Sequence, residues 1–153
     1  MIKKTFFLLA LALVMVSAFT ADATAARNQK IAIKLQEFTI DPLPSSEARA
    51  GKVQMKVTNT GTLTHEMVLV RAASVTKLPK VTTPGGERAV GAVNEEAIAE
   101  RDKMGETGDV KPGKTVTKTF RLRPGHYVMF CNIDDTAGNH FARAMYDEFV
   151  VTK

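Results

Sequence analysis

The single cysteine of this chain is followed closely by an imidazole and a thioether. Cys131, His140 and Met145 lie within fifteen residues of one another, and His65 stands far upstream in Thr64-His65-Glu66. A thiolate, two imidazoles and a weak axial thioether together suit copper, because soft sulfur donors favour it over hard cations. The sequence therefore predicts a mononuclear copper site that exchanges single electrons, with His65, Cys131, His140 and Met145 as its ligands.

Taken one at a time, these residues have ordinary structural explanations. Cys131 alone could be a small buried hydrophobe, and His65 alone could be a turn histidine. The combination favours ligation, because an unpaired cysteine in an exported chain suggests a ligating or reactive role. The other candidates are expected to be structural: His126 begins the strand that ends at Cys131, and Met129 lies two residues before Cys131, on the same face.

Short segments of alternating or continuous apolar residues, separated by Gly, Pro and Asn turns, account for most of the chain. They cover residues 31–36, 53–57, 67–70, 115–122, 126–131 and 149–151. This pattern predicts an all-β antiparallel sandwich or barrel. Cys131 ends one strand and His65 begins another directly after a turn, so the predicted site joins two parts of the sandwich.

The middle of the chain, residues 72–109, has a different pattern. Residues 72–91 are irregular and rich in Pro and Gly. Residues 94–105 predict a short helix, with Asn94 as N-cap, acidic residues in the first turn, Lys103 near the end and Gly105 after it. Its apolar stripe is thin, so we expect an inserted segment with a surface helix packed on the edge of the sandwich.

Three pieces of sequence resemble the small blue copper proteins, the cupredoxins of the plastocyanin and azurin type. They are the segment 59–66 ending in Thr64-His65-Glu66, the strand Pro124-Gly-His-Tyr-Val-Met-Phe-Cys131, and the Cys–His–Met loop before Phe149-Val150-Val151. The resemblance covers about residues 30–153. It implies a Greek-key β-sandwich, outer-sphere electron transfer, equatorial ligation by His65, Cys131 and His140, and axial ligation by Met145.

The chain departs from that family in two places. Eight residues separate Cys131 from His140, where family members usually have a few, and residues 134–137 read as an exposed, solvated insertion. Ala144 precedes Met145, where the family often has glycine. This difference matters if the position needs a positive φ.

The surroundings of the site can also be anticipated. An apolar shell around the sulfur is expected from Phe130, Ile133 and Phe141. Backbone N–H groups after Asn132 should hydrogen-bond to the sulfur, and Asn59 or Thr64 should brace the loop before His65. We expect His140 to be the more exposed imidazole, with its outer edge facing redox partners across an apolar patch.

Other functions fit the residues less well. A multicopper oxidase would need His-Cys-His, but Cys131 is flanked by Phe130 and Asn132, and a dinuclear copper site would need a second cysteine. We therefore expect no enzyme. A copper carrier on the same fold remains the alternative, although the chain lacks a Met- or His-rich tail, and a metal-free structural domain is a third possibility. An electron carrier implies a redox donor and acceptor, such as a cytochrome or an oxidase, and we expect a monomer.

The N-terminus predicts export. Lys3 and Lys4 precede an apolar run over residues 6–19, and A-x-A cleavage sites end at Ala23 and Ala25. The run is shorter than the roughly 20 residues of a membrane span, although an uncleaved anchor is the alternative. Residues 1–25 are thus predicted to be a signal peptide and residues 26–153 a single periplasmic or secreted domain, without stable membrane insertion after cleavage. That domain holds 19 basic and 15 acidic residues, a net charge near +4, without the clustered basic patch of a nucleic-acid-binding protein.

Overall fold

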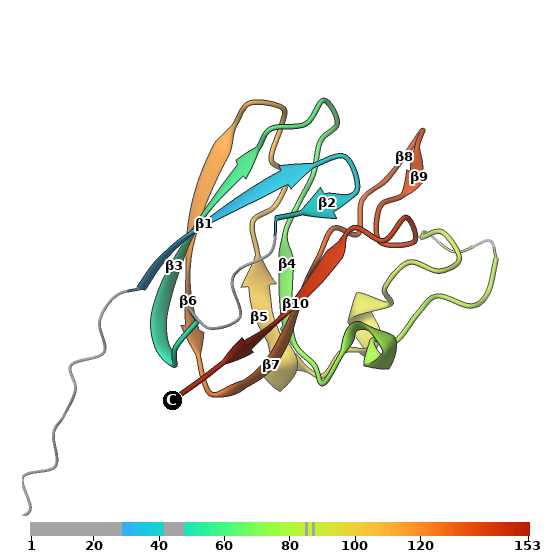
Figure 1. The fold of residues 1–153 in the computed structure, drawn as a ribbon. Helices are drawn as coiled ribbons and strands as arrows, with labels where there is room; N and C mark the ends of the chain where they lie inside the picture. The colour runs from blue at the N-terminus through green and yellow to red at the C-terminus, as the bar shows by residue number, and fades with distance from the viewer. Residues whose placement is uncertain (1–28, 42–47, 85, 87) are drawn as a thin grey trace, which may run out of the picture.

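Two four-stranded sheets pack face to face in this structure, a computed structural model that describes residues 29–41, 48–84, 86 and 88–153 (Figure 1). The signal segment expected over residues 1–25 lies outside these residues. The first sheet has the strand order β2-β1-β3-β6 and the second has the order β10-β7-β4-β5. In the described part of the chain, no helix has the length and apolar character needed to cross a membrane.

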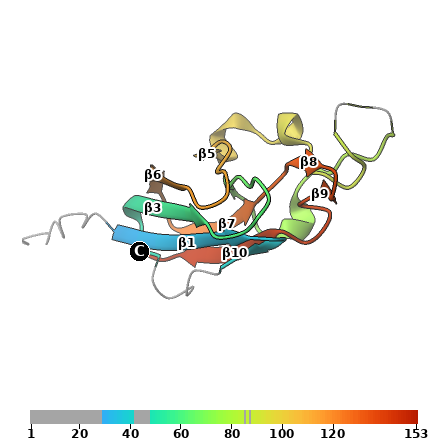
Figure 2. The ribbon, with the colours of Figure 1, turned by 90° about the horizontal axis from the view of Figure 1, so that it is seen from above.

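The strands β1, β3, β4, β6, β7 and β10 lie where the apolar pattern of the sequence predicts them. The first sheet contains β1 (Gln29–Gln36), β2 (Thr39–Ile40), β3 (Gly51–Asn59) and β6 (Thr115–Leu122). The second contains β4 (Val68–Arg71), β5 (Lys103–Glu106), β7 (Gly125–Phe130) and β10 (Tyr146–Val151). A separate hairpin, β8 (Asp134–Asp135) and β9 (Gly138–Asn139), and three short 3₁₀ turns, η1 (Val75–Lys77), η2 (Glu95–Ala97) and η3 (Glu100–Asp102), complete the described elements. In both ribbon views the β8–β9 hairpin projects from the right-hand side of the sandwich (Figure 2). Turn η1 lies alongside β10, where the Val75 N–H donates to Oε1 of Glu148 (2.6 Å).

One pairing differs from the antiparallel arrangement expected from the sequence. Strands β1 and β3 run parallel, with Gln29 opposite Val53 and Leu35 opposite Asn59. Parallel neighbours need a crossover connection instead of a tight hairpin. Here the chain contacts the end of the second sheet just before β3. The Ala50 N–H donates to the carbonyl of Thr152, the residue after β10 (2.7 Å). The sandwich is therefore mixed.

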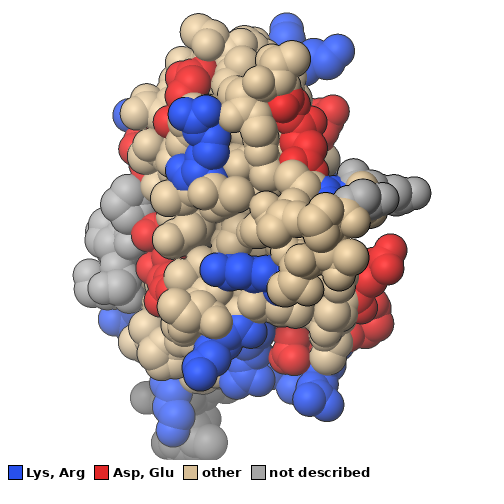
Figure 3. Space-filling model, turned by 90° about the vertical axis from the view of Figure 1, so that its right-hand side faces the viewer, with Lys and Arg blue, Asp and Glu red and all other residues tan. Residues whose placement is uncertain are grey.

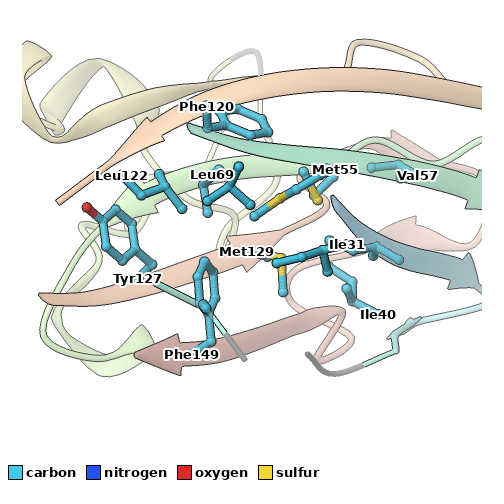
Figure 4. Close-up of a cluster of buried hydrophobic side chains, with 14 of the residues drawn as sticks. Ile31, Ile40, Met55, Val57, Leu69, Phe120, Leu122, Tyr127, Met129 and Phe149 are labelled. Carbon is cyan, nitrogen blue, oxygen red and sulfur yellow. The ribbon is translucent and has the colours of Figure 1, made fainter. Parts of the chain in front are cut away.

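The main core fills the space between the two sheets. Alternate residues of β1 and β3 point into it, as the two-residue period of a strand requires. Figure 4 shows the apolar side chains of both sheets meeting there, among them Ile31, Met55, Val57, Leu69, Met129 and Phe149. Cys131 and Met145 belong to the same buried cluster, so the predicted copper ligands lie at one end of this core.

A second apolar cluster lies on the outer face of the second sheet. Val68 and Val70 of β4 pack there with Val128 and Phe130 of β7. The middle segment covers this face through three residues of the same cluster, which are Leu78, Val93 and Ile98. This cover explains why residues 68–70 of β4 and 127–130 of β7 are continuously apolar, because both faces of these stretches are buried. The segment thus covers a sheet face, whereas the sequence predicted packing on an edge.

The prediction of a helix over residues 94–105 is wrong. The structure has two separate 3₁₀ turns, η2 and η3, interrupted by Ala99 in an extended conformation (φ −61°, ψ 137°). Asn94 makes no side-chain cap hydrogen bond. Lys103 and Gly105, expected at the helix end, belong to β5, which pairs with β4. Backbone pairing along the edge of the sheet therefore outweighs a local helical preference that had only a thin apolar stripe to support it.

The turn before β7 explains the Gly-x-Tyr part of the cysteine strand. The Tyr127 hydroxyl donates to the Arg123 carbonyl (2.9 Å) and accepts from the Arg123 N–H (3.1 Å). Gly125 has φ 149°, and a Cβ there would lie 3.0 Å from Nε of Arg71. Only glycine accommodates both this backbone and this close approach. The closed turn sets the start of the strand that leads to Cys131.

Candidate metal centre

His65, Cys131 and His140 come together at one end of the sandwich. One donor atom from each lies within 4.8 Å of the others. Nδ1 of His140 is 3.2 Å from Nδ1 of His65 and 3.3 Å from Sγ of Cys131. Donors bound to one metal ion at about 2.0–2.3 Å in a trigonal arrangement lie about 3.5 Å apart. The three side chains, which are 0% exposed, therefore fit a single metal ion.

Short stretches of backbone pairing position each of these residues. Cys131 directly follows β7, whose register against β4 and β10 places its end. His65 forms an isolated antiparallel bridge with Val110, with hydrogen bonds of 2.7 and 3.2 Å. His140 follows β9, and its N–H donates to the Ile133 carbonyl (2.9 Å). All three ligand candidates thus have backbone tied to a neighbouring segment.

Met145 lies beside Cys131 in the core. Its carbonyl accepts the Cys131 N–H (3.1 Å) and its own N–H donates to the His140 carbonyl (3.0 Å). The side chain is 0% exposed. Ala144 has φ 66°, the left-handed conformation that costs about 1–2 kcal/mol for a residue with a Cβ. The position before the methionine does require a positive φ, and this chain meets the requirement with alanine.

The sulfur of Cys131 is buried and accepts hydrogen bonds from backbone N–H groups. The Glu66 N–H donates to Sγ (3.4 Å), and the Ile133 N–H also stabilises the thiolate, as expected for N–H groups after Asn132. Burial outweighs both and raises the pKa of the Cys131 thiol to about 11. The thiol therefore keeps its proton at neutral pH in the metal-free protein. A metal ion bound by this sulfur would have to displace that proton, because a cysteine binds metal as the thiolate.

Asn59 braces the loop before His65, as the sequence suggested for Asn59 or Thr64. Its Nδ2 donates to the carbonyls of Leu63 and Val110 (2.7 Å each), and its Oδ1 accepts the Gly61 N–H (2.9 Å). The side chain is fully buried. Because Val110 also pairs with His65, one buried amide holds both sides of this ligand in place.

A second brace of the same loop was not anticipated. Oε1 of Glu37, which follows β1, accepts the N–H and hydroxyl of Thr62 and the N–H of Leu63. These bonds, the Thr62 N–H above all, lower the pKa of Glu37 to about 2. Gly61 permits the approach, because a Cβ there would lie 2.5 Å from the same oxygen. A lone exposed glutamate carries no sequence signal for this contact.

Glu37→Gln is expected to destabilise the protein at pH 7 and to weaken its acid sensitivity. The carboxylate is stabilised on folding, so its contribution is present above pH 4.5 and disappears as the pH falls through about 2. Urea unfolding of wild type and Glu37→Gln at pH 7, 4 and 2.5 measures this difference. Glu96→Gln, which changes an exposed glutamate of η2, is the matched control. A difference between wild type and Glu37→Gln that is the same at all three pH values would contradict the assignment.

Asn132, the residue after Cys131, holds the middle segment (residues 72–109) in place through hydrogen bonds. Its Oδ1 accepts the Val93 N–H (2.9 Å), while its Nδ2 donates to the Val93 carbonyl (2.9 Å) and to Oε1 of Glu95 (2.7 Å). Arg88 donates to the Asn132 carbonyl (3.0 Å), and the Asn132 N–H donates to Oε1 of Glu66 (3.1 Å). The residue next to Cys131 is therefore anchored on both its side chain and its backbone.

The apolar shell expected around the sulfur is only partly correct. Ile133 packs against the inner core that contains Cys131. Phe130 and Phe141 contact each other in the outer cluster, with ring centroids 5.7 Å apart. Phe130 must face away from Cys131, because successive strand residues point to opposite sides. Phe38 packs against the inner core and contacts the His140 ring, and the sequence did not indicate this aromatic neighbour of the site.

His140 is buried, whereas the sequence predicted an exposed outer edge. Its side chain is 0% exposed, and Nε2 lies 3.1 Å from Oδ2 of Asp135. Phe38, in a positive-φ conformation (57°), places its ring edge-on to the imidazole at 5.3 Å. Residues 134–137, expected to be an exposed insertion, are indeed mostly exposed, and they form β8 and the turn of the hairpin that supplies this aspartate. His126, by contrast, lies exposed on β7, opposite Val150.

Sequence comparison identifies no relative of this chain: no protein-family model matches it, and no curated protein does so either. The two packed sheets and the placement of the ligand candidates at one end of the core define the cupredoxin fold, which this chain has. Solved structures of auracyanins share it. Reduced auracyanin from Roseiflexus castenholzii matches with a TM-score of 0.56 and 20% identity over 82% of this chain and 98% of its own.

Two further auracyanin structures match in the same way. Auracyanin B gives a TM-score of 0.56 at 17% identity, over 82% of this chain and 89% of its own. Auracyanin A, a blue copper protein from Chloroflexus aurantiacus, gives 0.51 at 19% identity, over 80% of this chain and 99% of its own. At these identities the shared property is the fold.

Proposed function

We propose that this chain binds one copper ion through His65, Cys131 and His140, with Met145 as axial ligand, and carries single electrons between redox proteins. The observation that carries the proposal is the convergence of two imidazole Nδ1 atoms and one thiol sulfur in a buried cluster. When bound, copper would supply a one-electron Cu(II)/Cu(I) couple. The fold shared with a blue copper protein supports the same conclusion.

The way the donors are held favours electron transfer over copper delivery. His65, Cys131, His140 and Met145 are all 0% exposed, so a recipient protein has no direct access to a donor atom. Buried Asn59 and Asn132 fix the segments that carry His65 and Cys131. A site held in this way changes little between oxidation states, which speeds electron exchange, whereas a delivery site needs exposed, mobile donors.

The surface at the end of the sandwich that carries the β8–β9 hairpin bears on the choice of redox partner. Figure 3 shows basic and acidic side chains interspersed among uncharged ones, without a broad field of one sign on the visible described surface. Nucleic acid would require a continuous basic face. We propose that a monomer meets its redox donor and acceptor at this end, and that it acts as a carrier and not as an enzyme.

Copper titration followed by voltammetry tests the proposed function. We expect one copper ion per chain and a reversible one-electron wave. His65→Ala and His140→Ala should remove both, while His126→Ala, the third histidine of the chain, should leave both unchanged. Copper that binds at 1:1 but cannot be reduced and reoxidised reversibly would instead support the delivery alternative.

Compartment and domain limits complete the proposal. We propose that residues 1–25 act as a signal peptide and that residues 26–153 form one periplasmic or secreted domain, without stable membrane insertion. The charged start, the apolar run and the A-x-A sites support export. N-terminal sequencing of the protein recovered from the periplasm or medium should show cleavage after Ala23 or Ala25. A full-length chain in the membrane fraction would contradict it.

A further inference from the structure

The outer nitrogen of His140 has a carboxylate partner. Nδ1 of this imidazole faces Cys131 and His65, and Nε2 on the opposite side of the ring lies 3.1 Å from Oδ2 of Asp135. Asp135 cannot donate as a carboxylate, so Nε2 is the donor and carries the proton. The bond therefore selects the tautomer whose Nδ1 lone pair points into the metal centre.

Asp135 is itself held in place. Its Oδ1 accepts the Ala137 N–H (2.7 Å), and Arg143 donates to the Ala137 carbonyl (2.8 Å). Asp135 also pairs with Gly138 across the β8–β9 hairpin. The guanidinium of Arg143 stacks over the Phe38 ring, 3.9 Å from its centroid. The carboxylate thus belongs to a defined turn, and its side chain is only 26% exposed.

We propose that Asp135 is a positioning residue of the copper centre: by accepting the Nε2 proton of His140 it fixes the ligand-ready tautomer and strengthens Nδ1 as a donor to Cu(II). This inference rests on the proposed copper function. A carboxylate bonded to the outer nitrogen of a ligating histidine raises the basicity of the ligand. A more basic imidazole stabilises Cu(II) relative to Cu(I), so the bond lowers the reduction potential.

The same contact removes the His140 edge from solvent. The imidazole is enclosed by the Asp135 turn on its outer nitrogen and by Phe38 on its side. A partner protein that approaches this end of the molecule would therefore touch the hairpin, and not the ligand ring. Asp135 should therefore control two measurable quantities. One is the midpoint potential of the copper ion, and the other is the EPR signal of Nε2 of His140, the ring nitrogen remote from the metal.

Asp135→Asn in the copper-loaded protein tests the proposal, with Asp134→Asn as matched control. Asp134 is the neighbouring aspartate of β8, and its carboxylate contacts the Ala89 N–H (3.4 Å), not His140. Both variants remove one negative charge, but only Asp135→Asn weakens the Nε2 hydrogen bond. We expect the Cu(I)/Cu(II) affinity ratio to rise about tenfold in Asp135→Asn, an upward shift of about 59 mV. Asp135→Glu, which keeps a carboxylate, should show a smaller upward shift than Asp135→Asn.

Two spectroscopic measurements separate positioning from simple charge or folding effects. Pulsed EPR should show a changed remote-nitrogen quadrupole coupling in Asp135→Asn and an unchanged one in Asp134→Asn. In the copper-free wild type, nitrogen–proton NMR correlations should show His140 protonated at Nε2, a result that depends on no variant and on no metal. His140 protonated at Nδ1 would overturn the inference, and so would equal potentials in the two variants. A wild type without a copper–thiolate site would overturn the proposed function instead.

Discussion

Cys131→Ser is expected to weaken Cu(I) binding more than a hundredfold while the sandwich still folds. The thiolate is the only soft anionic donor at the site, and a serine hydroxyl keeps its proton and does not replace it. Substitution of residues that merely support a ligand already costs 10–100-fold in metal affinity, so loss of the thiolate itself should cost more. Competition with a chromophoric Cu(I) chelator measures the effect.

Met129→Leu is the matched control for this experiment. Met129 lies on β7, two residues before Cys131, is equally buried and also carries sulfur. Exchange of methionine for leucine conserves volume and leaves a core nearly intact. The control should keep the wild-type affinity, whereas similar losses in both variants, or none in Cys131→Ser, would contradict ligation by Cys131.

Asn132→Ala is expected to lower the free energy of unfolding by about 3 kcal/mol. The substitution leaves the N–H and carbonyl of Val93 without their partner in a buried location, and each unsatisfied group costs about 1–3 kcal/mol. Denaturant unfolding of the metal-free protein measures the loss. Asn94→Ala, in the same segment but without a capping bond, is the matched control and should change stability little.

Hydrogen exchange can show where the stability is lost. If Asn132 holds the middle segment in place, amides of residues 88–98 should lose more protection in Asn132→Ala than those of β1 and β3, which lie in the other sheet. An even loss across both sheets would mean that Asn132 supports the sandwich as a whole. Wild-type protection in residues 88–98 would mean that the segment is held by its apolar contacts alone.

The strands and the donor set could be predicted because both depend on local pattern. Alternating or short continuous apolar runs mark the main strands of both sheets, and the donor types of His65, Cys131 and His140 point to one kind of metal. The glycine difference at Ala144 likewise indicated a backbone requirement, which its φ of 66° bears out. These inferences need no knowledge of which segments meet in space.

Most of the errors concern contacts between distant segments, whereas the placement of Phe130 beside the sulfur went against the local alternation of its own strand. Residues 94–105 have helical end signals, but pairing with β4 turns their last part into a strand. Asp135 is exposed, as the sequence suggests, but nothing in its own neighbourhood shows that its carboxylate reaches Nε2 of His140. The direction of β1 relative to β3 depends on the crossover between them, and Glu37 reaches the His65 loop only in the folded sandwich.

The visible absorption and EPR spectra of the Cu(II)-loaded mature chain test the central claim most directly. A buried Cys131 thiolate with two imidazoles predicts an intense thiolate-to-copper band in the visible and an unusually narrow copper hyperfine splitting. Both features should be absent from Cys131→Ser. A colourless copper complex, or spectra that do not depend on Cys131, would contradict a copper site that carries electrons in this protein.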